Sequence, residues 1–133
     1  MQAEDYNFEL METQKYFHQE VEIQLSIFRP ERGKFENQDI FKNAEFWLEK
    51  GINIQSSQRN NADANNVALD YYLSGVKIDP CHLGCTYNVG CCHYFNGKYV
   101  NARKWFSLAI KVNSEHLDSY FGLAASCLKL GLD

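Results

Sequence analysis

Apolar residues recur about every 3.6 positions through most of the chain after residue 40, the spacing that places them on one face of an α-helix. Two such faces lie within residues 41–54 and 67–76, and the second ends at Asp79-Pro80. Further helices are predicted over about residues 84–95, 99–112 and 117–130, with Asn96-Gly97 as the turn between the first two. No segment after residue 40 shows a sustained strand-like alternation. The pattern therefore predicts an all-α fold of short antiparallel helices.

Polar stretches interrupt this periodicity at residues 33–39 and 55–66. The second contains only two alanines as apolar residues and is expected to be a long loop. The N-terminal segment is ambiguous. Leu10, Phe17 and Val21 suit a helix over about residues 8–26, which we favour, although apolar residues from Val21 to Ile27 also alternate with polar ones as in a strand.

A repeat of 34 residues is the strongest pattern in the chain. Shifting the sequence by this length places small residues on small ones and large residues on large ones, as stacked helical hairpins require. The matched pairs are Tyr87 with Phe121, Val89 with Leu123, Gly90 with Ala124, Ala68 with Ala102, Tyr72 with Phe106, Gly75 with Ala109 and Val76 with Ile110.

The segment from Leu83 onward resembles a tetratricopeptide repeat. The residues that fit the family's 34-residue pattern are Val89 and Gly90 on helix A, Gly97 and Tyr99 at the turn, and Ala102, Phe106 and Ala109 on helix B. Thr86, His93 and Ser114 depart from it. The resemblance implies a short α-solenoid of antiparallel helix hairpins, a right-handed superhelix, with a divergent, loop-bearing repeat at 44–82, a full repeat at 83–116 and an incomplete repeat at 117–133. Residues 1–43 form an acidic lead-in, partly helical.

The resemblance also implies a function, because tetratricopeptide repeats bind peptides or partner helices in a concave groove lined by helix A. The positions that would line it here form an aromatic, nearly uncharged surface suited to an apolar or extended peptide. The candidate residues are Tyr87, Asn88, Cys91, Tyr94, Phe121 and Leu128. Tyr87 and Tyr94 could equally pack against the neighbouring repeats.

One ligand class of the family is not expected. The acidic C-terminal tails of chaperones are held by Lys, Asn and Arg or Lys on three successive helices A, and only Asn88 matches this set. Leu48, Ile52, Asp118 and Gly122 occupy the other positions, so a carboxylate would meet Asp118 in place of a cation.

Composition and charge narrow the class of protein further. The chain has 133 residues, 45% of them hydrophobic and 23% charged, with 2 Pro and 8 Gly, which is typical of one globular domain or part of a larger array. Residues 1–40 hold nine Asp and Glu against four Lys and Arg, and the pI near 5.5 argues against a nucleic-acid partner. No apolar run is long enough for membrane insertion, and residues 1–12 do not resemble a signal peptide. An odd number of cysteines, five, favours a reducing, cytoplasmic setting.

The cysteines and histidines between Cys81 and His93 suggest an alternative, metal-binding or redox-sensing function. Cys81, Cys85 and Cys92 fall near one face of a helix, and His82 could complete four zinc ligands. The spacing is unusual for zinc, and cysteine also serves as a small core residue. No catalytic motif is present, and His93 points about 100° away from Cys92 on a helix. We therefore expect a scaffold without catalysis, metal or cofactor.

The last predicted helix lacks the partner helix that would complete its hairpin. Leu123, Cys127, Leu128 and Leu130 lie on it, whereas repeat arrays normally end in a helix with a polar outer face. We therefore expect either a longer solenoid or docking of this helix on another protein or another copy of the chain.

Overall fold

The computed structural model describes residues 38–59 and 61–131. The chain divides into two units, Met1–Arg32 and Gly33–Asp133, and the described helices belong to the second. The helix expected over residues 8–26 lies outside the described residues.

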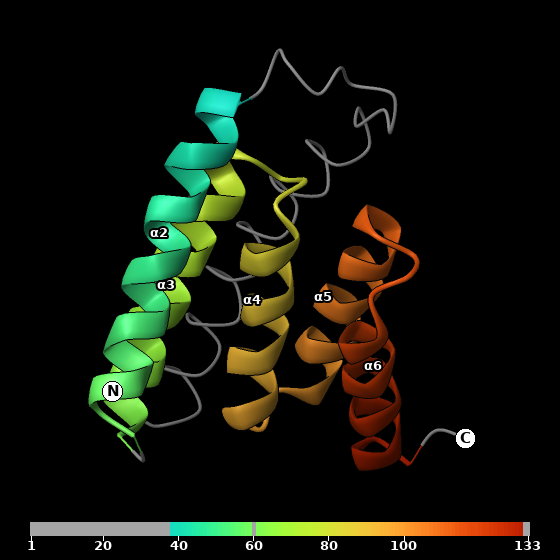
Figure 1. The fold of residues 1–133 in the computed structure, drawn as a ribbon. Coiled ribbons are helices and arrows are strands. Elements are labelled where there is room, and N and C mark those ends of the chain that lie inside the picture. The colour runs from blue at the N-terminus through green and yellow to red at the C-terminus, as the bar shows by residue number, and fades with distance from the viewer. Residues whose placement is uncertain (1–37, 60, 132–133) are drawn as a thin grey trace, which may run out of the picture. The chain divides into compact units, whose positions relative to one another are not determined.

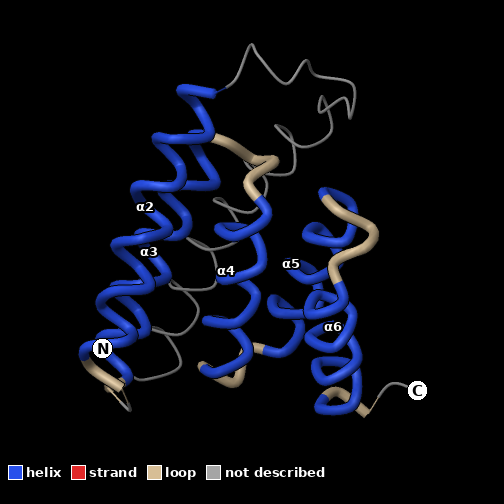
Figure 2. Tube along the Cα trace, viewed as in Figure 1, coloured by secondary structure: helices blue, strands red, loops and turns tan. Residues whose placement is uncertain are grey.

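The described part of the chain is entirely helical apart from its turns (Figures 1 and 2). Its helices are α2 (Gln38–Ser57), α3 (Ala62–Ile78), α4 (Leu83–Phe95), α5 (Tyr99–Val112) and α6 (Leu117–Lys129). The last three coincide with the predicted ranges to within one residue. The Asn96-Gly97 turn is also confirmed, since Gly97 has a positive φ of 77° that L side chains rarely adopt.

The helices pack as successive hairpins. Each helix contacts the next one in the chain, and α4 also contacts both α2 and α6 (Figure 1). The first hairpin is α2 with α3, the second is α4 with α5, and α6 lies against α5. The all-α hairpin fold expected from the sequence is therefore confirmed. The surface formed by α2, α4 and α6 is called the helix-A face below.

A glycine opposite an aromatic ring brings the two helices of each hairpin close together. In the first hairpin Gly51 lies against the ring of Tyr72, and in the second Gly90 lies against the ring of Phe106. A methyl group added at Gly90 would approach the Phe106 ring to 2.8 Å, closer than carbon atoms pack. Tyr72 and Phe106 are 34 residues apart and both are buried, so the two hairpins use the same crossing contact.

The expectation of a long loop over residues 55–66 is wrong. Helix α2 continues to Ser57 and α3 already begins at Ala62, so the extra residues of this hairpin lengthen its helices. The side chain of Asn61 caps α3 by accepting hydrogen bonds from the backbone N–H groups of Asp63 and Ala64 at 2.9 and 3.3 Å. Ala64 is buried, which makes it a core position of α3.

Among the described residues, no helix combines the length and the apolar character needed to cross a membrane.

Candidate functional site

Helix α4 stands at the centre of the helix-A face, and His82 fixes where it begins. His82 is buried, and its Nδ1 accepts a hydrogen bond of 3.2 Å from the backbone N–H of Cys85. Because Nδ1 is the acceptor, the neutral ring carries its proton on Nε2, which lies 2.6 Å from Oε2 of Glu45 on α2. Phe41, also on α2, packs on the imidazole with ring centroids 4.6 Å apart. One side chain thus caps α4 and joins it to α2.

Helix α4 buries one side and leaves the other accessible. Its buried residues are Cys85, Thr86, Val89, Gly90, Cys92 and His93. The four residues of α4 predicted to line the site, Tyr87, Asn88, Cys91 and Tyr94, lie together on the other side and are partly exposed, beside Phe95, which is 76% exposed. Helix α4 contains no Asp, Glu, Lys or Arg, so the accessible strip is uncharged.

Tyr87 contributes both to packing and to this strip. Its ring lies 5.7 Å from Phe106 on α5 and 5.0 Å from His116 before α6. Burial raises the pKa of its hydroxyl, and a hydrogen bond with the Cys91 thiol and the negative charge of Asp118 raise it further. Tyr87 therefore stays neutral, holds α5 and α6 against α4, and presents only part of its surface.

The other two polar positions of the strip are also restrained. Tyr94 packs edge-on against Phe95 and Tyr99, with ring centroids 5.9 and 5.3 Å away. The Asn88 amide donates a hydrogen bond of 2.7 Å to the backbone carbonyl of Gly84, one turn earlier. The strip is therefore held in place before any ligand binds, which lowers the entropy that binding costs.

Helix α6 contributes the most exposed residues of the predicted site. Phe121 and Leu128 are 70% and 73% exposed. Both lie on the helix face turned away from Ser119 and Ser126, the buried residues of α6. All six predicted residues therefore have accessible surface, four of them on α4 and two on α6.

The Lys and Arg residues that would hold an acidic chaperone tail are absent from the matching positions of the helix-A face. Leu48 lies against Gly84 on α4, and Gly122 lies against the ring of Phe106 on α5. Ile52 is exposed, and Asp118 is a carboxylate near Tyr87 and Cys91. These positions present apolar surface and a negative charge to any peptide that reaches them.

Two buried cysteines of the Cys81–His93 cluster, Cys85 and Cys92, are poorly suited to thiolate chemistry. Burial raises the pKa of Cys85 to about 12, and the carboxylates of Glu45 and Asp79 add to the shift. Burial likewise raises the pKa of Cys92 to about 12, with a contribution from Cys91. Thiolates bind metals and react with oxidants, whereas these thiols stay protonated at neutral pH.

The metal hypothesis receives no geometric support. Over residues 38–59 and 61–131, no group of three or more His, Cys, Asp and Glu side chains is arranged to hold a metal ion. His82, the fourth ligand considered, is engaged by Glu45 and by the backbone of Cys85.

A cluster of amide side chains that the sequence pattern does not reveal joins the first hairpin to α4. Asn65 on α3 accepts a hydrogen bond of 2.9 Å from Gln55 on α2 and donates one of 2.8 Å to Asn96 after α4. The Tyr72 hydroxyl donates to Gln55 at 2.6 Å, and Asn96 donates to Asn66 at 3.1 Å. Asn61, ahead of an acidic residue, could have revealed the start of α3, but the pairing of the amides depends on the packing of three helices.

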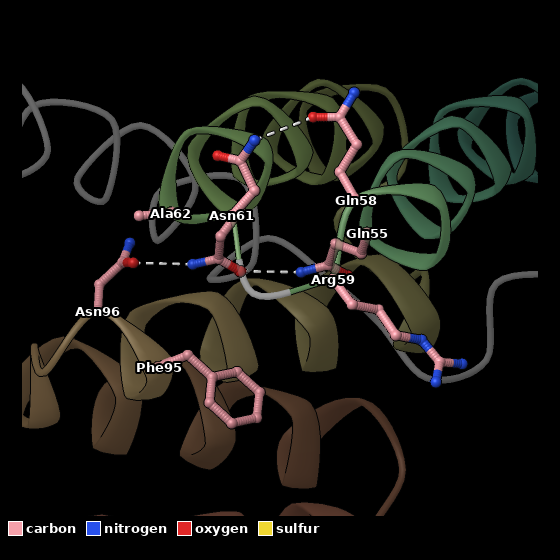
Figure 3. Close-up of a pocket in the computed structure, with 8 residues that line it drawn as sticks. Gln55, Gln58, Arg59, Asn61, Ala62, Phe95 and Asn96 are labelled. Carbon is pink, nitrogen blue, oxygen red and sulfur yellow. Dashed lines mark hydrogen bonds between the residues drawn. The ribbon is translucent and has the colours of Figure 1, made fainter.

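This amide cluster forms one wall of a pocket of about 580 Å³ (Figure 3). The exposed ring of Phe95 lies on the opposite side from Gln58 and Asn61, and the Arg59 guanidinium extends away from the amides. Asn65 donates both of its amide protons within the protein, to Asn96 and to the carbonyl of Cys92. The main role of the cluster is therefore to hold the first hairpin against α4.

A scan against protein-family models finds no match for the chain, and no curated protein matches it at a significant level. The resemblance to the tetratricopeptide repeat family therefore rests on the 34-residue pattern of the sequence.

Proposed function

We propose that this chain is a protein–protein interaction module of the tetratricopeptide repeat type, which binds a peptide or a partner helix through the helix-A face. The observation that carries the proposal is the uncharged, partly exposed strip of α4 beside exposed Phe121 and Leu128 on α6. Large exposed apolar residues gathered on one surface of a folded protein are typical of interaction sites.

The ligand that suits this surface is apolar or aromatic and carries no acidic terminus. Tyr87 and Tyr94 supply flat rings with a polar edge, while Phe121 and Leu128 supply apolar area. Asp118 is an acidic group near Tyr87 and Cys91 of the strip, and it would favour a basic residue in the ligand over a carboxylate. Binding of a chaperone-type acidic tail is therefore not expected, and a micromolar dissociation constant for such a peptide would contradict this.

The module acts without catalysis of its own in the cytoplasm, where its five cysteines stay reduced. It binds no nucleic acid, and α6 takes part in self-association. The buried, protonated thiols of Cys85 and Cys92 do not favour the redox or metal alternative, so no second function is proposed from them.

A peptide display experiment with the full chain tests the binding site. Asn88→Arg places a bulky cation on the α4 strip, and Ser107→Arg is the matched control on α5, because Ser107 bonds the carbonyl four residues earlier just as Asn88 does. We expect peptides enriched in apolar and basic residues, and at least about tenfold weaker binding to Asn88→Arg. Ser107→Arg should bind like the wild type. Equal affinities for the two variants would place the site elsewhere, and a selection without any enrichment would refute the function.

A further inference from the structure

Helix α6 packs on α5 through one side and carries exposed apolar residues on the opposite side. On one side it packs through Ser119, Gly122 and Ser126, whose small size lets it approach α5 closely. A methyl group added at Gly122 would come within 2.6 Å of the Phe106 ring. Leu117, on the other side, is 69% exposed, similar to the exposure of Phe121 and Leu128. Large apolar side chains gathered on an exposed face are typical of interaction sites, so this outer side is suited to a partner.

The spacing of the outer residues indicates what kind of partner fits. Leu117, Phe121, Ala124 and Leu128 follow one another at intervals of four, three and four residues, which is the spacing of a coiled-coil seam. This seam extends for about 16 Å at 1.5 Å per residue. A second helix is the element that would cover a straight, narrow apolar line of this length.

The charged residues beside the seam indicate which helix would cover it. Asp118 in the first turn of α6 and Lys129 in the last turn are eleven residues apart, so they lie within about 20° of each other around the helix. An antiparallel copy of α6 would place Asp118 beside the partner's Lys129, and its symmetry would form the same pair a second time. A parallel copy would place the two Asp118 residues on opposite sides of the seam, so neither would meet a lysine of the partner.

We propose that two copies of this chain associate through antiparallel α6 helices, with the seam from Leu117 to Leu128 buried and Asp118 paired with the partner's Lys129. The inference rests on the proposed function in one respect, the use of α6 as a contact helix, and it names a second copy as the partner. It leaves the α4 strip accessible but covers Phe121 and Leu128, so a ligand that also contacts α6 would compete with the second copy for these two residues.

Charge reversal of the full chain tests the pairing by sedimentation velocity over a series of concentrations. Asp118→Lys alone and Lys129→Asp alone each create like-charge pairs, so each variant should dissociate at concentrations at least about tenfold higher than the wild type. An equimolar mixture of the two single variants should form heterodimers, because each lysine then meets an aspartate. The double variant Asp118→Lys/Lys129→Asp should recover homodimers. Failure of both the mixture and the double variant to recover dimers would overturn the antiparallel pairing.

An apolar variant tests the seam, and far-UV circular dichroism verifies folding. Leu128→Glu should make the chain monomeric, whereas Val100→Glu, at a residue of α5 that is 59% exposed, should leave the dimer intact. A wild-type chain that stays monomeric up to near-millimolar concentration would refute the inference. Asn88→Arg separates the two proposals, since it should weaken peptide binding and leave sedimentation unchanged.

Discussion

His82 should be one of the most important single residues for the stability of the described helices. Only about 2% of its surface is exposed, and it joins three elements of the structure. Its ring caps α4, donates to Glu45 on α2 and packs against Phe41. Replacement by alanine removes all three interactions, and replacement by asparagine keeps a side-chain acceptor for the cap.

The loss of stability expected for His82→Ala follows from these contacts. Loss of the cap for the Cys85 N–H costs about 1 kcal/mol. A hydrogen bond to a carboxylate contributes about 1.5–3 kcal/mol when it is buried, but the Glu45 side chain is 40% exposed and regains water, which reduces this to about 1 kcal/mol. The space left beside Phe41 costs about another 1–2 kcal/mol. His82→Ala should therefore lower the free energy of unfolding by about 3–4 kcal/mol, and His82→Asn by about 1 kcal/mol less.

Urea denaturation of the full chain, followed by far-UV circular dichroism, measures these differences. A shift of the midpoint at constant slope reports a change in stability, whereas a lower slope for His82→Ala would show that the first hairpin unfolds separately from the rest. The reasoning would be refuted if His82→Ala stayed within about 0.5 kcal/mol of the wild type. Equal losses for the alanine and asparagine variants would show that the cap contributes nothing.

Two further predictions concern packing and thiol reactivity. Gly90→Ala gains helix propensity but forces a methyl group against the Phe106 ring, so the free energy of unfolding should fall by about 1–2 kcal/mol. In a double-mutant cycle with Phe106→Leu, the combined loss should be smaller than the sum of the two single losses. Strict additivity would contradict the contact. Because pKa values of about 12 leave only about one thiol in 10⁴ ionised at pH 8, Cys85 and Cys92 should resist alkylation in the native protein and react faster as the pH rises. Mass spectrometry after brief alkylation should find the partly exposed Cys81 and Cys127 modified before Cys85 and Cys92, and rapid modification of Cys92 at neutral pH would revive the redox hypothesis.

Periodicity alone predicted the existence, type and order of the helices. The reason is that short helices joined by tight turns depend on local signals: apolar residues every 3.6 positions, Asn96-Gly97 at a turn, and Asp79-Pro80 after a helix. The repeat also predicted which side of α4 stays accessible, because equivalent small residues must face the neighbouring helices.

Other features depended on contacts between residues far apart in the chain. The weak helix propensity of its amides predicts a loop over residues 55–66, yet in the fold Gln55, Asn65 and Asn96 form hydrogen bonds with one another across three helices. His82 became a cap and a bridge only because α2 brings Glu45 to its ring.

For the candidate site, the sequence alone determined that α4 carries no Asp, Glu, Lys or Arg and that the last helix is rich in apolar residues, whereas the structure decided that Leu117, Phe121 and Leu128 are the exposed ones. Only the tertiary structure decided that Tyr87 is largely engaged in packing and that the thiols of Cys85 and Cys92 are shielded from water. The physical reason is that composition and spacing fix which groups a helix presents. Burial, and with it pKa and accessibility, depends on which neighbouring helices cover those groups.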